Sequence, residues 1–295
     1  MNMKEWFTGT IQPELGAWLI EKITGIVPFN IEYGYNLAEA CEHMKYGGLI
    51  TYFLPHTTIW DPTLITQRIL HPFLMAKKGM MKWAASAKFS PEIIKQFGLP
   101  WSMLRAKAAT LYAQSFGFEN IPFIQSYLFD EFHKFFEGKS KEIGVINFRS
   151  FRHLYKHVSQ SHPGAIVAIS PEGTRNDNGG LLRAHDGLGT LLEVPHTKAL
   201  PIVLCGAHRI QSPSQSGFDD VNPFVPVTAH IGRPLNFAQA YHIAERHRWT
   251  DPNKTFTISD ALMLHAIEQC GLEVINPTVD PRGAYACENI RSCSV

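Results

Sequence analysis

The stretch AIVAISPEGTR, residues 165–175, gives the clearest indication of the fold. Its first six residues are apolar or small, which is typical of a buried strand, and the proline and glycine that follow predict a tight turn. Similar short apolar runs predict further strands at 143–148, 200–206 and 227–232, with helices between them at 151–159 and 187–194. Alternating strands and helices indicate an α/β fold with a mostly parallel mixed sheet covered by helices.

The first half of the chain predicts a helical segment, a strand and a helical insertion. Apolar residues recur at helical spacing over 12–27, which predicts an amphipathic helix, and a second helix is expected over 37–45. LITYFL (49–54) predicts the first buried strand, and 64–141 is expected to be mostly helical. The expected organisation is an N-terminal helical segment (1–47), a central domain with the insertion (48–235), and C-terminal helices with a polar tail (236–295).

Composition argues against several functional classes. The chain has 295 residues, and its 27 lysines and arginines nearly balance 26 acidic residues, which argues against a nucleic-acid-binding protein. Its five cysteines are scattered at spacings that match no metal site, so reduced thiols in a cytosolic compartment are expected. The sequence has no recognisable signal peptide and no long apolar run, so no membrane span is expected.

Residues 68–107 have an uneven distribution of charge. Eight basic residues stand against one acid, Glu92, with aromatic and methionine residues between them. One interpretation is a helical subdomain with a solvated basic face, and the other is a surface that docks on anionic lipid. The basic residues are Arg68, Lys77, Lys78, Lys82, Lys88, Lys95, Arg105 and Lys107.

The first candidate for chemistry is HTTIWD (56–61), which directly follows the strand LITYFL. Loops at strand ends are where sites are built in such sheets, and Pro62 favours a turn at Asp61. A carboxylate beside an imidazole fixes its tautomer and raises its basicity, as a general base requires. The alternative is that Asp61 caps the following helix and His56 is an incidental loop histidine.

Two further stretches follow strands or begin them. SPEGTR (170–175) brings Glu172 and Arg175 to the sheet edge where His56 is expected, and backbone amides near Gly173 together with Arg175 are suited to a phosphate. The alternative is an ordinary turn with a surface ion pair. LPIV (200–203) places a proline at the expected start of a strand, where its missing N–H costs little.

In this order, HTTIWD, SPEGTR and LPIV resemble the motifs of the glycerolipid acyltransferase family, which includes glycerol-3-phosphate and 1-acylglycerol-3-phosphate acyltransferases. SPEGTR is the specific part, and the resemblance covers roughly residues 48–235, including VTAHIGRPL (227–235). It implies transfer of a fatty acyl group from acyl-CoA or acyl-carrier protein to a hydroxyl of glycerol-3-phosphate or a lysophospholipid, with lysophosphatidate favoured. No metal or organic cofactor is implied.

The resemblance also implies roles for individual residues. His56 and Asp61 correspond to the catalytic pair. The residues expected to bind an acceptor phosphate are Glu172, Gly173, Thr174 and Arg175, and those expected to place the acyl donor are Pro201 and Ile202.

The family has a further acceptor-binding arginine that follows a strand. GVINFR (144–149) is the match, which makes Arg149 the candidate. ENIPFIQ (119–125) competes with it but carries Gln125 where arginine belongs, and Arg152 is a further alternative. The sequence departs from the family pattern at Pro55 and Thr58, and by its long stretch from Asp61 to Arg149.

Partners and pathway follow from the same resemblance. The expected partners are the acyl donor, a phosphate-bearing lipid acceptor and an anionic membrane surface, with the protein cytoplasmic and peripheral on the inner face of a membrane. A thioesterase-type hydrolase and a non-catalytic lipid-binding protein are the rival interpretations. No serine or cysteine motif accompanies His56, so direct transfer without an acyl-enzyme is expected.

Overall fold

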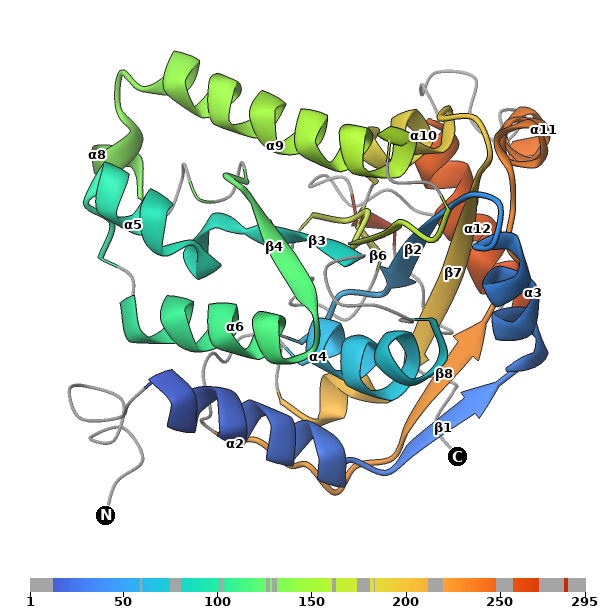
Figure 1. The fold of residues 1–295 in the computed structure, drawn as a ribbon, viewed down its shortest axis with the longest axis horizontal. Helices are drawn as coiled ribbons and strands as arrows, with labels where there is room; N and C mark the ends of the chain where they lie inside the picture. The colour runs from blue at the N-terminus through green and yellow to red at the C-terminus, as the bar shows by residue number, and fades with distance from the viewer. Residues whose placement is uncertain are drawn as a thin grey trace.

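The computed structural model describes residues 13–58, 60–74, 81–100, 103–125, 128, 132–160, 163–173, 181–182, 184–211, 220–247, 257–270 and 284–285. Within these residues the fold is a seven-stranded sheet with helices on both faces (Figure 1). No helix in this part of the chain is long and apolar enough to cross a membrane.

The sheet has the strand order β1-β8-β7-β2-β5-β3-β4. Every neighbouring pair is parallel except β7 and β8, which are antiparallel. The predicted α/β fold with a mostly parallel mixed sheet is therefore confirmed. The strands are β1 (Phe29–Glu32), β2 (Gly48–Leu54), β3 (Met81–Ser86), β4 (Phe118–Phe123), β5 (Ile166–Ile169), β7 (Thr197–Cys205) and β8 (Val227–Ile231), and a separate antiparallel pair consists of β6 (Leu181–Leu182) and β9 (Ala284–Tyr285).

The helices vary widely in length. The longest is α9 (Ser140–Gln160). The others are α2 (Pro13–Ile26), α3 (Tyr35–His43), α4 (Asp61–Ile65), the π-helix η1 (Thr66–Leu74), the 3₁₀-helix η2 (Ala87–Phe89), α5 (Pro91–Phe97), α6 (Met103–Ser115), α8 (His133–Phe136), α10 (Gly187–Leu192), the 3₁₀-helix η3 (Ala207–Arg209), α11 (Phe237–His247) and α12 (Ile258–Gln269).

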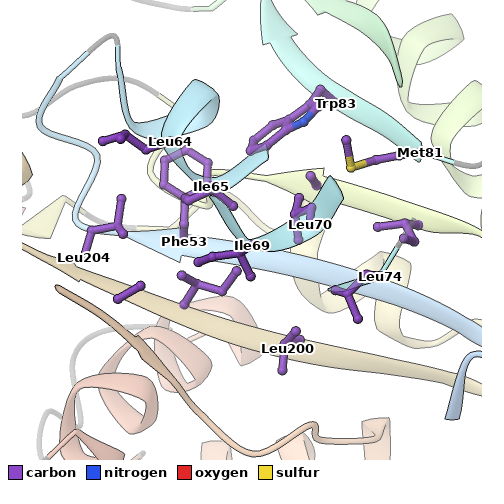
Figure 2. Packing of buried hydrophobic residues seen from close by; sticks show 14 of the residues in the cluster. Phe53, Leu64, Ile65, Ile69, Leu70, Leu74, Met81, Trp83, Leu200 and Leu204 are labelled. Carbon is purple, nitrogen blue, oxygen red and sulfur yellow. The ribbon is translucent and has the colours of Figure 1, made fainter. Parts of the chain in front are cut away.

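The sheet separates two apolar cores. Side chains alternate along a strand, so Ile50 and Tyr52 of β2 belong to the core that they share with α9, α10, α11 and α12, whereas Leu49 and Phe53 belong to the core on the other face. That second core is filled by α3, α4, η1 and part of α6, and Figure 2 shows Phe53 and Trp83 packed against side chains of α4 and η1. β2 is buried along its whole length, as the apolar run LITYFL predicts for a strand covered on both faces.

The segment 64–141 contains helices, as predicted, but it is not a purely helical insertion. It contributes β3 and β4, which extend the main sheet beyond β5. Both strands have weak strand signals, because MKWAAS is rich in alanine and FENIPF contains Pro122. The proline is tolerated because β4 is the edge strand of the sheet, where a missing N–H leaves no gap between strands.

The predicted strand at 143–148 is wrong. These residues lie within α9, whose buried residues Ile143, Ser150, Leu154 and Val158 recur at helical spacing. Val145 and Phe148 made the run look like a strand, but both face solvent. A short apolar run cannot be assigned to strand or helix from its hydrophobicity alone. The N-terminal segment also differs from expectation, since its β1 joins the sheet beside β8.

Candidate active site

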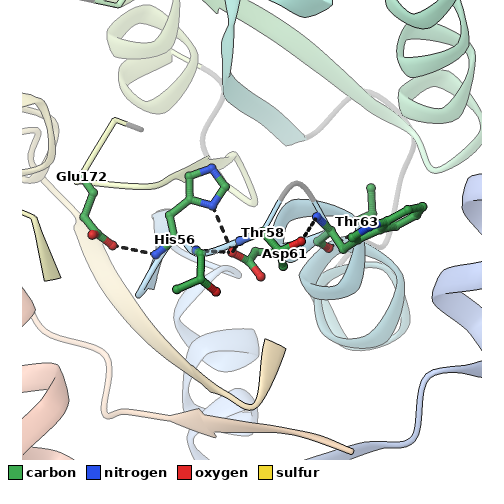
Figure 3. A network of polar contacts seen from close by, with 7 residues as sticks. His56, Thr58, Asp61, Thr63 and Glu172 are labelled. Carbon is green, nitrogen blue, oxygen red and sulfur yellow. Dashed lines mark hydrogen bonds and ion pairs between the residues drawn. The ribbon is translucent and has the colours of Figure 1, made fainter. Parts of the chain in front are cut away.

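Two turns meet where β2 and β5 end. These strands are parallel neighbours in direct register, so their carboxyl ends lie at one edge of the sheet. The turn after β2 carries His56 and Asp61, and the turn after β5 carries Glu172 and Gly173. Figure 3 shows His56 between Asp61 and Glu172. The structure therefore brings together the histidine, the aspartate and the glutamate of the two motifs.

His56 and Asp61 are in direct contact. His56 Nδ1 lies 3.0 Å from Asp61 Oδ2. An ionised carboxylate only accepts hydrogen bonds, so the proton of a neutral His56 ring belongs on Nδ1, and Nε2 is left with a lone pair. The Asp61 side chain is fully buried, whereas the His56 side chain is 16% exposed. Such an arrangement suits general-base chemistry by a histidine that a buried partner orients.

Asp61 does not cap α4, of which it is the first residue. Its Oδ2 accepts the backbone N–H groups of Thr57 at 2.8 Å and Thr58 at 2.9 Å, both of which precede α4. The N-cap of α4 is Trp60, which makes no side-chain capping hydrogen bond, and Pro62 lies in the first turn. The capping interpretation is therefore wrong, and the carboxylate instead closes the turn around the histidine.

Other residues of the turn fix its shape. Thr58 Oγ1 accepts the N–H of Trp60 at 3.3 Å, which gives the threonine hydroxyl a structural use. The Trp60 ring is buried and its Nε1 donates to Gln211 Oε1 at 3.2 Å. Thr63 Oγ1 donates to the Trp60 carbonyl oxygen at 2.8 Å. The turn is thus held from both sides by hydrogen bonds.

Glu172 anchors the turn from the neighbouring strand. Its Oε1 accepts the N–H of His56 at 2.7 Å and its Oε2 accepts the N–H of Leu182 at 2.9 Å. Glu172 is only 2% exposed, and this burial raises the pKa of its carboxyl to about 8, despite the two N–H groups that lower it. Each oxygen accepts one backbone N–H group, so Glu172 links the backbone of His56 to that of Leu182 and helps to position His56. Its predicted contact with an acceptor phosphate stays a prediction.

Gly173 is required by a close approach. Its φ is +67°, and a Cβ there would lie 2.6 Å from Cδ2 of His185. The Gly173 N–H donates to the Ser170 carbonyl oxygen at 3.1 Å, so this amide serves the turn rather than a phosphate. The other two residues predicted to hold the phosphate, Thr174 and Arg175, lie outside the described residues.

The structure does not place Arg149 at this turn. Arg149 lies within α9, not after a strand, and lines a cavity of about 510 Å³ that follows the edge strand β4 between α6 and α9. Neither His56 nor Asp61 lines that cavity. The competing stretch ENIPFIQ does contain a strand, β4, after which Gln125 follows. The strand pattern expected before the acceptor-binding arginine is therefore met at Gln125 and not at Arg149.

Pro201 and Ile202 lie in the middle of β7, not at its start. Both are buried. Ile202 pairs with Ile231, and Ala199 pairs with Leu235. Between these two pairs, residues 200–201 of β7 lie opposite residues 232–234, so the longer segment after β8 forms a bulge. The missing N–H of Pro201 falls at this bulge, which explains why an interior strand accepts a proline. Their predicted role in placing the acyl donor stays a prediction.

Sequence reasoning missed the positioning role of Glu172 and the packing of His185 over Gly173. The sequence around Glu172 does not indicate this role, because its partners are backbone N–H groups 116 and 10 residues away. Among the described residues, no group of three or more histidine, cysteine or acidic residues is arranged to hold a metal ion.

The chain matches no protein-family model and no curated protein sequence. Among solved structures, it is similar to the crystal structure of the 1-acyl-sn-glycerophosphate (LPA) acyltransferase PlsC from Thermotoga maritima. The two sequences are 12% identical, the alignment covers 86% of this chain and 88% of that chain, and the TM-score is 0.43.

Proposed function

We propose that this protein is an acyltransferase that moves a fatty acyl group from a thioester carrier to a hydroxyl of a phosphate-bearing glycerolipid precursor. The observation that carries the proposal is the hydrogen bond from His56 Nδ1 to the buried Asp61 Oδ2, because it directs Nε2 away from the carboxylate as a proton acceptor. The resemblance of HTTIWD and SPEGTR to the glycerolipid acyltransferase motifs supplies the substrate class.

In the proposed reaction, His56 Nε2 takes the proton of the acceptor hydroxyl as its oxygen attacks the thioester carbonyl carbon. The tetrahedral intermediate collapses with cleavage of the C–S bond, and the leaving thiolate receives the proton from His56. The buried Asp61 carboxylate stabilises the imidazolium that forms between these two proton transfers. Arg175 is assigned to the acceptor phosphate, which would hold the hydroxyl against the base.

Direct transfer is supported by the surroundings of Cys205 and Ser170, the two candidate nucleophiles. Cys205 is 2% exposed within β7. The Ser170 hydroxyl is buried and has no hydrogen-bond partner among the described residues, so no base is positioned to remove its proton. We therefore expect no acyl-enzyme intermediate.

The test is an assay of thiol release with acyl-CoA and a panel of acceptors, including glycerol-3-phosphate and lysophosphatidate. The wild-type protein should release thiol only when an acceptor is present. His56→Ala should lower kcat by ~10²–10⁴-fold, because a general base is lost. The matched control is His133→Ala, which removes an exposed histidine of α8.

Other results would contradict the proposal in distinct ways. Equal thiol release with and without acceptor would indicate a hydrolase. Near-normal turnover by His56→Ala would remove His56 from the chemistry. Binding of acyl-CoA without any turnover would indicate a lipid-binding protein.

A further inference from the structure

The face of α9 that points away from the sheet has an unusual composition. The helix buries Ile143, Leu154 and Val158 against the molecule, so its apolar contacts with the core are already made. Its opposite face still exposes large apolar side chains, and Phe148 is 65% exposed. We call this face the α9 outer face, and it consists of Lys141, Val145, Phe148, Arg152, Tyr155 and Lys156.

The charge of the α9 outer face is one-sided. Its three cations, Lys141, Arg152 and Lys156, have no ion-pair partner among the described residues. Glu142 is the one acidic residue in the sequence of α9. Apolar side chains flanked by cations along one rigid helix form a surface that is complementary to a partner with acidic and apolar side chains.

The α9 outer face begins beside the catalytic edge of the sheet. The Asn147 side chain donates to the Ile124 carbonyl oxygen and accepts the Ile124 N–H, each at 2.8 Å. Ser150 Oγ donates to the Pro122 carbonyl oxygen at 2.6 Å. These contacts fix the first half of α9 against the end of β4, at the same edge of the parallel sheet as His56. A partner docked there would be held near the turn.

The position of α2 decides between a membrane and a protein as that partner. In Figure 1, α2 and α9 lie on opposite sides of the sheet. α2 also exposes apolar residues, with Trp18 50% exposed and Ile26 53% exposed. A flat bilayer that receives α2 cannot also reach the α9 outer face, so this face remains open to water and to a water-soluble partner.

We propose that the α9 outer face docks the acidic helical surface of an acyl-carrier protein that delivers the thioester. This inference rests on the proposed acyl transfer and specifies the donor. The partner's acidic residues meet Lys141, Arg152 and Lys156, and an apolar side chain of the partner meets Phe148.

The test compares two donors that bear the same acyl chain, acyl-carrier protein and acyl-CoA, with the full-length protein. Arg152→Glu with Lys156→Glu should lower kcat/KM for the carrier-protein donor by at least ~10-fold, since reversed rim charges slow association. The same variant should change kcat/KM for acyl-CoA by less than ~2-fold. Phe148→Ala should lower kcat/KM for the carrier-protein donor and leave kcat/KM for acyl-CoA unchanged. The matched control is Lys95→Glu with Lys107→Glu, an equal change of charge on α5 and α6 that should affect neither donor.

Calorimetric binding of the unacylated carrier protein keeps this inference separate from the proposed function. Loss of binding by the reversed variant supports the docking site even if no acceptor is ever turned over. Equal losses with both donors, or unchanged binding and kinetics with the carrier protein, would overturn it. Loss of binding to anionic vesicles by the same variant, with carrier-protein binding intact, would overturn it in favour of a membrane.

Discussion

At the scale of single residues, Asp61 does more than contact the imidazole. One of its oxygens accepts hydrogen bonds from His56 Nδ1 and from the N–H groups of Thr57 and Thr58, while Oδ1 is buried without a partner among the described residues. The carboxyl group of Asp61 therefore orients the His56 ring and holds the turn together at once. A substitution at Asp61 should therefore affect both kcat and the free energy of unfolding, and the two effects can be measured separately.

Asp61→Asn should lower kcat by ~10²–10⁴-fold, because the amide can turn an N–H toward Nδ1 and favour the wrong tautomer. The same change should cost about 1–3 kcal/mol in the free energy of unfolding, since a buried acceptor of charge-assisted hydrogen bonds is lost. Steady-state kinetics and urea unfolding measure the two effects. Asp186→Asn, at an exposed aspartate before α10, is the control. A variant with wild-type kcat would show that Asp61 serves the turn alone.

Glu172 makes the stability of the protein depend on pH. Burial raises the pKa of its carboxyl from 4.5 to about 8, so in this interval the folded protein holds a proton that the unfolded chain has released. Its contribution to stability is complete below pH 4.5 and is lost as the pH rises through about 8. Glu172→Gln should flatten the dependence of the urea midpoint on pH between about 5 and 8. The control Glu245→Gln should show the same slope of urea midpoint against pH as the wild-type protein. If Glu172→Gln also keeps the wild-type slope, Glu172 is not the group responsible.

At the scale of elements, the bulge between β7 and β8 fits a proline into an interior strand. Pro201 lies where Gly232 approaches it, and a Cβ on Gly232 would come within 2.4 Å of Pro201 Cγ. The Pro201 carbonyl oxygen accepts the N–H of Gly232 at 2.9 Å, so the backbone has no room to withdraw. The glycine and the proline are therefore a matched pair.

Gly232→Ala should lower the free energy of unfolding by ~1–3 kcal/mol, because an added methyl group overpacks the bulge. Gly232→Ala combined with Pro201→Ala should recover part of that loss, which thermal and urea unfolding would show. Gly144→Ala is the control, because a Cβ there meets nothing within 4 Å and the change should stabilise α9 by ~0.5–1 kcal/mol. If the double variant loses as much free energy of unfolding as the two single variants together, Gly232 and Pro201 do not depend on each other.

At the scale of the whole molecule, α2 offers an exposed apolar surface that we propose as a membrane contact, and docking through the basic run at 68–107 stays a prediction. Arg68 donates to the Gly25 carbonyl oxygen and Lys82 is paired with Glu119, whereas Lys95 and Lys107 of the same run are exposed. Lys77 and Lys78 lie outside the described residues. The exposed apolar residues of α2, Leu15, Trp18 and Ile26, remain as the proposed contact.

Trp18→Glu should lower partitioning into lipid vesicles by at least ~10-fold, because a charge replaces a large apolar side chain at the interface. Vesicle flotation with neutral and anionic lipid measures this change. Tyr46→Glu, at an aromatic residue that is 74% exposed near the end of α3, is the control and should leave partitioning unchanged. Equal flotation of wild-type protein and Trp18→Glu would show that α2 does not anchor the protein.

The outline of the fold and the pair of motifs could be predicted without coordinates. β2, β5, β7 and β8 were each indicated by a short apolar run between turn residues, and burial on both faces requires such runs. Contact between His56 and Asp61 was also predictable, because the two residues share one turn and Pro62 marks its end. These features depend on neighbours along the chain.

The remaining features depend on partners far apart in sequence. β3 and β4 have weak strand propensity and become strands because β5 and the sheet edge supply their hydrogen bonds. The run at 143–148 becomes helix because its buried positions match the helical period when α9 packs on the sheet. Glu172 could be recognised as an anchor of His56 only after β2 and β5 were placed side by side, since a hydrogen bond to a backbone N–H leaves no pattern in the sequence of the donor.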